Sequence, residues 1–192
     1  MKTYGRRGQM ALAGGFLAGG TLGAGLLPRP ARGQPAGRLR EDGPKVLPAL
    51  ALTDPEGARR DVPSLAGKGV VLNLWATWCP PCVEEMPALD RLAAALAAEG
   101  ILVIPASSDR GGRPVVEGFY AKAGVKNLGV WLDPNSAATR ALGARGLPTT
   151  VLIDRLGRER ARLEGAAEWD SAALLADVRR LCGDGGASTA PS

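Results

Sequence analysis

The sequence predicts an α/β domain with a central mixed β-sheet and helices on both faces. Two apolar runs, residues 70–75, which only Asn73 interrupts, and residues 101–106, are typical of strands that are buried on both faces. The segment between them, residues 80–99, has apolar side chains at helical spacing and ends at Gly100. A strand–helix–strand unit of this kind, followed by an antiparallel pair and a last helix, predicts a sheet covered by helices.

The remaining elements follow from turn signals and helical periodicity. Residues 54–57 (DPEG) and 154–157 (DRLG) are turn sequences between short extended segments, so each predicts an antiparallel pair of strands. The expected strands are residues 49–52 with 58–62 and residues 150–153 with 158–163, and the further helices are residues 115–123, 136–142 and 170–181.

Length and charge limit the possible functions. The chain has 192 residues, which fits one domain with extra sequence at its ends. The first 40 positions hold seven basic and no acidic residues, whereas 17 basic and 19 acidic residues follow from Glu41 onward. Because nucleic-acid binding needs clustered cations, no nucleic-acid partner is expected. Histidine is absent, which excludes imidazole catalysis and His-ligated metal sites.

The N-terminal segment has the pattern of an export signal. Arg6 and Arg7 precede an uncharged stretch rich in Gly, Ala and Leu, residues 8–27, and the pair resembles a twin-arginine signal. Cleavage before Gln34 would leave a soluble periplasmic domain, an uncleaved stretch would anchor the chain in the inner membrane, and a cytoplasmic location is the third alternative. The expected organisation is export signal or anchor 1–33, linker 34–44, folded domain 45–182 and disordered tail 183–192.

Cys79-Pro80-Pro81-Cys82 carries the predicted chemistry, because it lies where a strand ends and the long helix begins. The dipole and the free N–H groups of a helix N-terminus favour a thiolate, so Cys79 is the expected attacking thiol. Cys82 lies one turn deeper and can resolve the mixed disulfide that Cys79 forms. A zinc site would need four ligands, so no metal is expected; a purely structural disulfide is the other alternative.

A second motif is GLPTT at residues 146–150. A proline directly before a good strand disrupts it unless the proline occupies a special turn at the start of the strand. From the residues alone, Pro148 is either in a cis peptide bond or in an ordinary trans bond of a loop.

WATWCPPC at residues 75–82 together with GLPTTVLID at residues 146–154 resembles the thioredoxin superfamily, and more narrowly its exported TlpA-, ResA- and CcmG-like members. The resemblance extends over about residues 45–181. It implies a thioredoxin fold with an N-terminal β-hairpin and a central strand–helix insertion between about residues 107 and 134.

The resemblance also assigns roles to individual residues. It implies a cis Pro148 beside the cysteine pair and a Leu147 backbone that binds an extended substrate segment. The family has Asn at the position of Asn73, where thioredoxins keep a buried acid, and a Glu after the motif, so Glu85 is the candidate for moving the proton of Cys82. The alternative is that Glu84 and Glu85 are solvated acids that complement the helix dipole. The expected substrate surface comprises Trp78, Pro80, Pro81, Leu147 and Pro148, whereas Trp75, Trp131 and Trp169 are expected to pack and Cys182 to be a lone cysteine.

The implied activity is that of an exported thiol-disulfide oxidoreductase that reduces disulfides of partner proteins and needs no cofactor beyond the Cys79–Cys82 pair. A membrane thiol donor would supply electrons, and the clients would belong to cytochrome c maturation or to copper delivery for cytochrome oxidase. A monomer is expected. A thiol peroxidase and a copper-binding assembly factor are the alternatives. Thiol peroxidases have Thr three residues before the peroxidatic cysteine, and the copper-binding factors have a CxxxC motif and a distal His. Neither pattern is present in this sequence.

Overall fold

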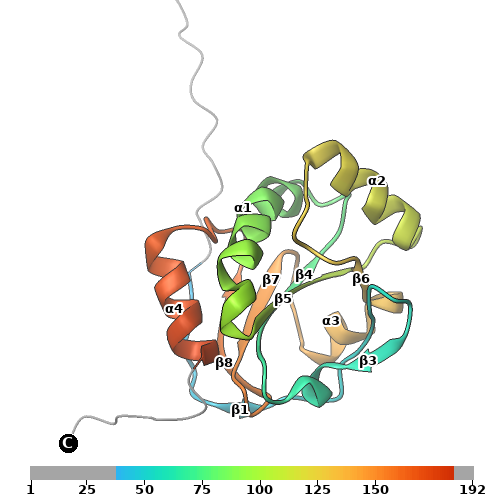
Figure 1. Cartoon of the computed structure of the whole chain (residues 1–192). Coiled ribbons are helices and arrows are strands. Elements are labelled where there is room, and N and C mark those ends of the chain that lie inside the picture. The colour runs from blue at the N-terminus through green and yellow to red at the C-terminus, as the bar shows by residue number, and fades with distance from the viewer. Residues whose placement is uncertain (1–37, 184–192) are drawn as a thin grey trace, which may run out of the picture. The chain divides into compact units, whose positions relative to one another are not determined.

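The computed structural model describes residues 38–183, and Figure 1 shows how the elements of this part are arranged. Eight strands of these residues form one sheet in the order β1-β8-β7-β4-β5-β6-β2-β3. The expected export signal and nearly all of the expected tail lie outside the described residues.

The centre of the sheet is β4 (Gly69–Trp75), whose seven residues are all buried, as its apolar run, interrupted only by Asn73, predicts. On one side β4 pairs in parallel with β5 (Ile101–Ser107), and on the other side it pairs antiparallel with β7 (Thr149–Ile153). β7 turns back into β8 (Arg158–Glu164) and forms the expected antiparallel pair. The mixed sheet predicted from the sequence is therefore confirmed.

The expected N-terminal hairpin is formed by β2 (Ala51–Thr53) and β3 (Arg59–Asp61). Two further strands were not assigned to residues from the sequence: β1 (Lys45–Val46) pairs with β8, and β6 (Trp131–Leu132), which lies between β5 and β2, falls within the strand–helix insertion that the family resemblance implies. A two-residue strand is too short to show any periodicity, which explains why neither has a sequence signal. Pairing also begins before residue 45, because Arg40 bridges Arg162 of β8.

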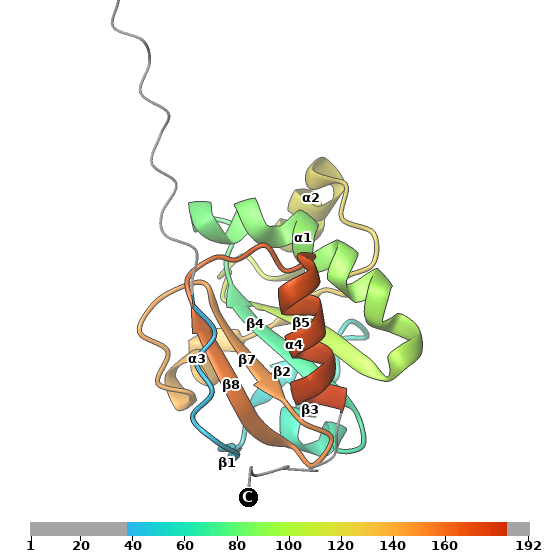
Figure 2. The same ribbon diagram turned by 90° about the vertical axis from the view of Figure 1, so that its left-hand side faces the viewer.

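Helices cover both faces of the sheet, as predicted (Figures 1 and 2). On one face, residues of α1 (Pro80–Leu96), α2 (Arg113–Ala123) and α4 (Ala172–Gly183) share a core cluster with Val71 and Trp75 of β4. The opposite face of β4 packs against α3 (Ala137–Ala141) and the N-terminal strands. Short 3₁₀ turns, η1 (Val62–Leu65), η2 (Ala97–Glu99) and η3 (Pro134–Ser136), complete the described elements. None of the helices in residues 38–183 has the length and apolarity needed to cross a membrane.

The end of α4 approaches β4 closely. A Cβ atom at Gly69 would lie 2.4 Å from the carbonyl oxygen of Cys182, so this contact requires glycine. Cys182 is completely buried, its sulfur lies 3.6 Å from the carbonyl oxygen of Val70, and burial raises the pKa of its thiol to about 12. A thiol in this state is a small packing side chain rather than a nucleophile.

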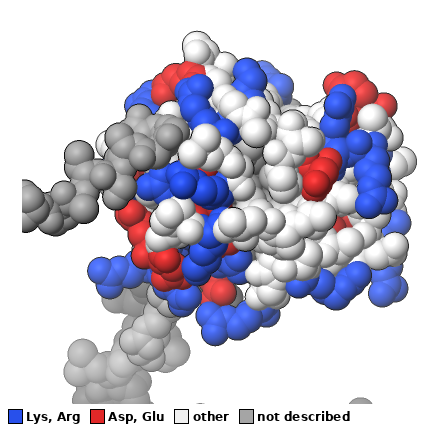
Figure 3. All heavy atoms as spheres, turned by 90° about the horizontal axis from the view of Figure 1, so that it is seen from below, with Lys and Arg blue, Asp and Glu red and all other residues white. Residues whose placement is uncertain are grey.

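Charged side chains of both signs are interspersed on the face that Figure 3 shows. The ion pairs include Arg180 with Glu41 and with Asp177, both at 2.6 Å. The near balance of charge from Glu41 onward thus takes the form of local pairs in the described part of the chain.

Candidate active site

The cysteine pair lies at the N-terminus of α1, as the sequence predicts. Cys79 is the N-cap residue in an extended conformation (φ −100°, ψ 104°), and Pro80 and Pro81 occupy the first helical positions, where no N–H is needed. The backbone N–H groups of Cys82 and Val83 donate to the carbonyl oxygen of Cys79 at 3.0 and 3.1 Å. Cys79 and Cys82 form a disulfide with Cα atoms 5.3 Å apart.

The two sulfur-bearing residues differ in access. Cys79 retains 5% of its surface, whereas Cys82 retains none. Beside them Trp78 is 67% exposed and Pro80 is exposed, so exposed apolar side chains flank the accessible cysteine in the sequence. Trp75, in contrast, is buried in the core as expected. A partner can therefore reach Cys79 first, over a surface that favours apolar contact.

The second motif lies at the same end of the sheet. The Leu147–Pro148 peptide bond is cis, the form that the resemblance implies. β7 starts immediately afterwards, and its first residue, Thr149, pairs with Leu74, near the end of β4 that leads into the cysteine motif. Leu147 is partly exposed and Pro148 is buried. The fold thus brings the cysteine motif and the cis-proline motif, which are far apart in the sequence, to the same end of the sheet.

An aspartate that the sequence reasoning missed fixes the loop before the motif. Asp109 accepts hydrogen bonds from the backbone N–H of Thr77 at 2.9 Å and from its hydroxyl at 2.7 Å. Asp109 follows β5, which runs parallel to β4, so the carboxyl ends of the two strands meet at this edge. That topological relation is the one signal that could have identified Asp109 in advance.

Glu85 is a buried acid held by neutral donors. Its Oε1 accepts from Asn73 Nδ2 at 2.8 Å, and its Oε2 accepts from Trp169 Nε1 at 2.8 Å and from the backbone N–H of Ala167 at 3.0 Å. Burial raises the pKa of Glu85 to about 7, although these hydrogen bonds act in the opposite direction. The alternative of a solvated Glu85 is therefore wrong, whereas Glu84 is exposed.

Asn73 connects Glu85 to the centre of the sheet. Its Nδ2 also donates to the hydroxyl of Thr150 in β7 at 2.9 Å. Its Oδ1 is buried and has no hydrogen-bond partner among the described residues. Glu85 and Cys82 are three residues apart on α1, so they share one face of the helix, and both are buried. A carboxyl group that can exist in either protonation state near neutral pH thus lies one turn from Cys82.

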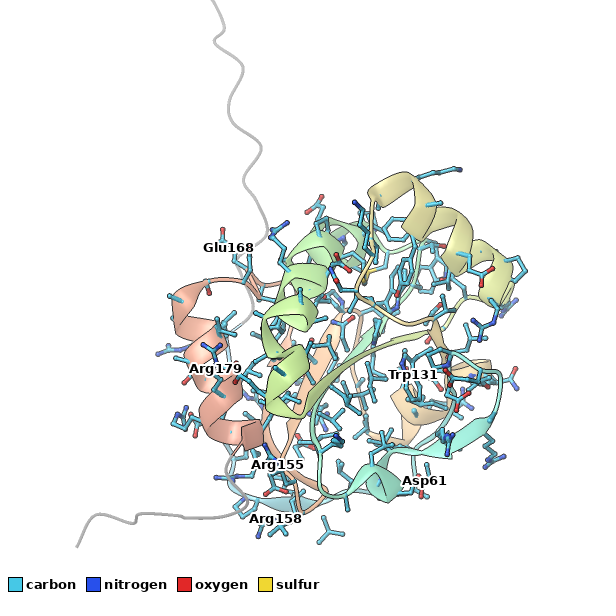
Figure 4. All side chains as sticks on the ribbon, in the orientation of Figure 1. Asp61, Trp131, Arg155, Arg158, Glu168 and Arg179 are labelled. Carbon is cyan, nitrogen blue, oxygen red and sulfur yellow. A yellow bond between two sulfur atoms is a disulfide. The ribbon has the colours of Figure 1, made fainter. Side chains whose placement is uncertain are left out.

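Trp169 has a polar role that the sequence reasoning missed. It was expected only to pack, and it does belong to the core cluster of α1, but its indole N–H also binds Glu85. It lies in the β8–α4 loop (residues 165–171), for which the sequence shows no periodicity. Figure 4 shows Glu168 of this loop at the end of the fold where α1 begins.

Comparison with known proteins decides the family. The family model described as Redoxin matches residues 41–177, which is most of the chain. The chain belongs to the Redoxin family. This Redoxin-family protein is also 35% identical over 114 residues to the thiol-disulfide oxidoreductase ResA of Bacillus thuringiensis strain Al Hakam, covering 59% of this chain and 65% of that relative. It thus spans less than two thirds of that relative's length.

Solved structures show the same fold. A crystal structure from Chlorobium tepidum that carries the name thiol:disulfide interchange protein DsbE superposes with a TM-score of 0.63 at 26% identity, over 74% of this chain and 99% of that one. The exposed lipoprotein thioredoxin Etrx1 of Streptococcus pneumoniae strain TIGR4 superposes with a TM-score of 0.59 at 26% identity, over 70% and 100% of the two chains. The predicted TlpA/ResA-type membership of the thioredoxin superfamily and the thioredoxin fold are both confirmed.

Proposed function

We propose that this protein is a thiol-disulfide oxidoreductase that exchanges electrons between its own cysteine pair and cysteine pairs of partner proteins. The observation that carries the proposal is the Cys79–Cys82 disulfide at the N-terminus of α1, of which only Cys79 retains any exposure. The names of the ResA relative and the DsbE structure support it.

In the reducing direction the reaction has two steps. The Cys79 thiolate attacks one sulfur of a client disulfide, which forms a Cys79–client mixed disulfide and releases the other client sulfur as a thiolate. Cys82 then loses its proton and attacks Cys79, which forms the Cys79–Cys82 disulfide and releases the second client thiolate. Two electrons pass from the protein to the client, and the two client thiolates take up protons to become thiols.

Glu85 is the proposed acceptor for the proton of Cys82. Its carboxylate lies on the same helix face one turn later, and a pKa of about 7 lets it take up or release a proton near neutral pH. A protonated Glu85 needs a hydrogen-bond acceptor for its own O–H. Rotation of the Asn73 amide would present its unpartnered Oδ1 for that purpose.

The proposed setting is the periplasm, with the chain either soluble or anchored to the inner membrane through residues 1–33. The leader pattern supports export, and one structural neighbour is named an exposed lipoprotein. In an oxidising compartment a reductant needs a thiol donor in the membrane. The clients we propose are disulfides of apocytochrome c or of copper-delivery proteins, bound as extended segments along Leu147 and Pro148.

Three cysteine variants test the activity. Cys79→Ser should abolish reduction of a disulfide-bonded peptide by the dithiol protein, because the attacking sulfur is gone. Cys82→Ser should accumulate a mixed disulfide with the peptide, visible by mass spectrometry under non-reducing conditions. Cys182→Ala is the matched control and should retain the wild-type rate. Activity that survives Cys79→Ser would overturn the proposal.

The direction is tested by the reduction potential of the pair, measured against glutathione in the Cys182→Ala background. A value near about −270 mV, as in thioredoxin, agrees with a reductant, whereas a value near about −120 mV would make the protein a disulfide donor. The location is tested by fractionating cells that produce the full chain or a chain starting at Glu41, which should remain in the cytoplasm.

A further inference from the structure

The β8–α4 loop (residues 165–171) is hydrogen-bonded to Pro148, to Glu85 and to Arg91 of α1. At its start the N–H of Gly165 donates to the carbonyl oxygen of Pro148 at 2.9 Å. At its end Asp170 accepts from Arg91 of α1 at 2.7 Å. Between these points Ala167 and Trp169 both donate to the same oxygen of Glu85. The loop therefore connects the cis proline, which directly precedes β7, to α1, at whose N-terminus the cysteines lie.

Trp169 and Glu85 fix each other's position. Trp169 is completely buried, so its indole N–H needs an acceptor inside the protein, and Glu85 is that acceptor. On the other side Asn73 holds the second carboxyl oxygen. With both oxygens bound from opposite elements, the carboxyl group has one orientation on the face of α1 that it shares with Cys82.

We propose that Trp169 is a positioning residue for proton transfer: its indole N–H holds the Glu85 carboxyl group in place for the proton of Cys82 and favours the carboxylate form. This assignment rests on the proposed function, because it needs Cys82 to lose a proton during the reaction. It goes beyond the packing role that the sequence suggests for Trp169.

Because only neutral groups among the described residues contact the Glu85 carboxyl, the hydrogen bonds that they donate are what stabilises its carboxylate form. The groups that contact its carboxyl are neutral: Asn73 from β4 and Ala167 and Trp169 from the loop. On α1 the titratable neighbours are Cys82 and the exposed Glu84, and β7 contributes the neutral hydroxyl of Thr150 to Asn73. The loop adds two exposed acids, Glu168 and Asp170, of which Asp170 is paired with Arg91. No described cation pairs with Glu85, so loss of the indole donor should favour its protonated form.

The first experiment measures the titration of Glu85 in the oxidised protein, where the disulfide cysteines do not titrate. The carboxyl ¹³C signal of Glu85 is followed by NMR from pH 4 to pH 9 in the wild type and in Trp169→Phe. Loss of a hydrogen bond to a charged group should raise the midpoint by about one pH unit. The matched control is Trp131→Phe, because the indole of Trp131 donates no hydrogen bond within the described residues; it should leave the midpoint unchanged. An unshifted midpoint in Trp169→Phe, or the same shift in both variants, overturns the proposal.

The second experiment measures the proton transfer itself. The dithiol protein is mixed with 5,5′-dithiobis(2-nitrobenzoate), and the rate of the second release of thionitrobenzoate, which reports attack by Cys82 on the mixed disulfide, is recorded against pH. Trp169→Phe should move the pH midpoint of this rate upward by the same amount as the NMR midpoint. In the Glu85→Gln background, Trp169→Phe should cause no further shift. An equal shift in both backgrounds overturns the proposal, because Trp169 would then act independently of Glu85.

A different variant covers the case in which Trp169→Phe fails to fold. Ala167→Pro removes the other donor to the same carboxyl oxygen and leaves the buried indole in place, so it should also raise the NMR midpoint. If the NMR midpoint rises but the thionitrobenzoate profile does not, the positioning role is wrong while exchange by Cys79 stands. If Cys79→Ser retains activity, the proposed function fails irrespective of the NMR result.

Discussion

Glu85 and Asp154 are both buried acids, yet the protein compensates them in different ways. Asp154, at the turn between β7 and β8, is bound by the cations of Arg158 at 2.8 Å and Arg160 at 3.6 Å, and by backbone N–H groups. Glu85 receives only neutral donors. Figure 4 shows Arg155 and Arg158 at the end of the fold opposite Glu168, so the two acids belong to opposite ends of the sheet.

Burial of a carboxyl group can therefore serve two purposes. A carboxylate that is paired with cations holds a turn together, because its removal would leave the arginines without their partner. A carboxyl group that is surrounded by neutral dipoles can change its protonation state without leaving a charge behind. The arrangement around Asp154 stabilises the fold, and the arrangement around Glu85 allows proton transfer.

The largest effect on stability is expected from Asp154→Ala. It leaves Arg158 and Arg160 without their common partner. Both arginines are partly exposed, so the loss should lie near the lower end of the about 3–5 kcal/mol that breaking a fully buried pair costs. Urea denaturation at neutral pH measures the loss, and the folded fraction should keep the wild-type rate of thiol exchange. Asp42→Ala removes a solvent-exposed pair with Lys45 and should cost far less, because solvent screens an exposed pair. Similar losses in the two variants would contradict the distinction.

Glu85→Gln should change how stability depends on pH. The pKa of Glu85 is raised from 4.5 to about 7 in the folded state, so the folded protein binds the extra proton between these values. The free energy of unfolding should therefore fall by about 3 kcal/mol as pH rises through this window. The contribution of Glu85 to stability is complete only below about pH 4.5 and is lost as pH rises through about 7. Urea denaturation at several pH values should show this decrease in the wild type and not in Glu85→Gln. A decrease of equal size in the variant would assign the slope to other groups.

The smallest effect is expected from Glu84→Gln, which changes the neighbouring acid by the same chemistry. Glu84 is exposed and makes no hydrogen bond or ion pair through its side chain within residues 38–183. Its replacement should alter the free energy of unfolding by less than about 0.5 kcal/mol and leave the pH dependence unchanged. A measurable shift of the pH profile would show that Glu84, and not only Glu85, takes part in proton movement.

Local signals allowed most of the fold to be predicted. Three such signals each depend on only a few neighbouring residues, and the elements that they predict are confirmed. They are the apolar run of β4, the spacing of Met86, Leu89 and Leu92 in α1, and Gly100 at the end of the helical segment. The two-residue strands β1 and β6 carry no such pattern, because their position depends on the strands beside them. The twin-arginine segment lies outside the described residues and stays a prediction.

Those parts of the site that depend on neighbouring residues in the sequence could be predicted, whereas those that depend on tertiary contacts could not. The position of Cys79 follows from a strand that ends and a helix that starts, so its place at the N-terminus of α1 could be inferred. The contact between Glu85 and Trp169 joins residues 84 positions apart through an irregular loop, and no short-range pattern encodes it. Choosing Glu85 over Glu84 needed the family resemblance; the buried environment that distinguishes them is a tertiary property.

Trp78 also makes the molecule easy to observe. Of the four tryptophans, Trp75 and Trp169 are buried, Trp131 is partly buried, and Trp78 alone exposes most of its side chain, directly before Cys79. A dissolved collisional quencher of fluorescence would therefore act mainly on the indole of Trp78, directly beside Cys79. Covering of that indole by a bound peptide would register as reduced quenching, so docking could be timed separately from the exchange of electrons.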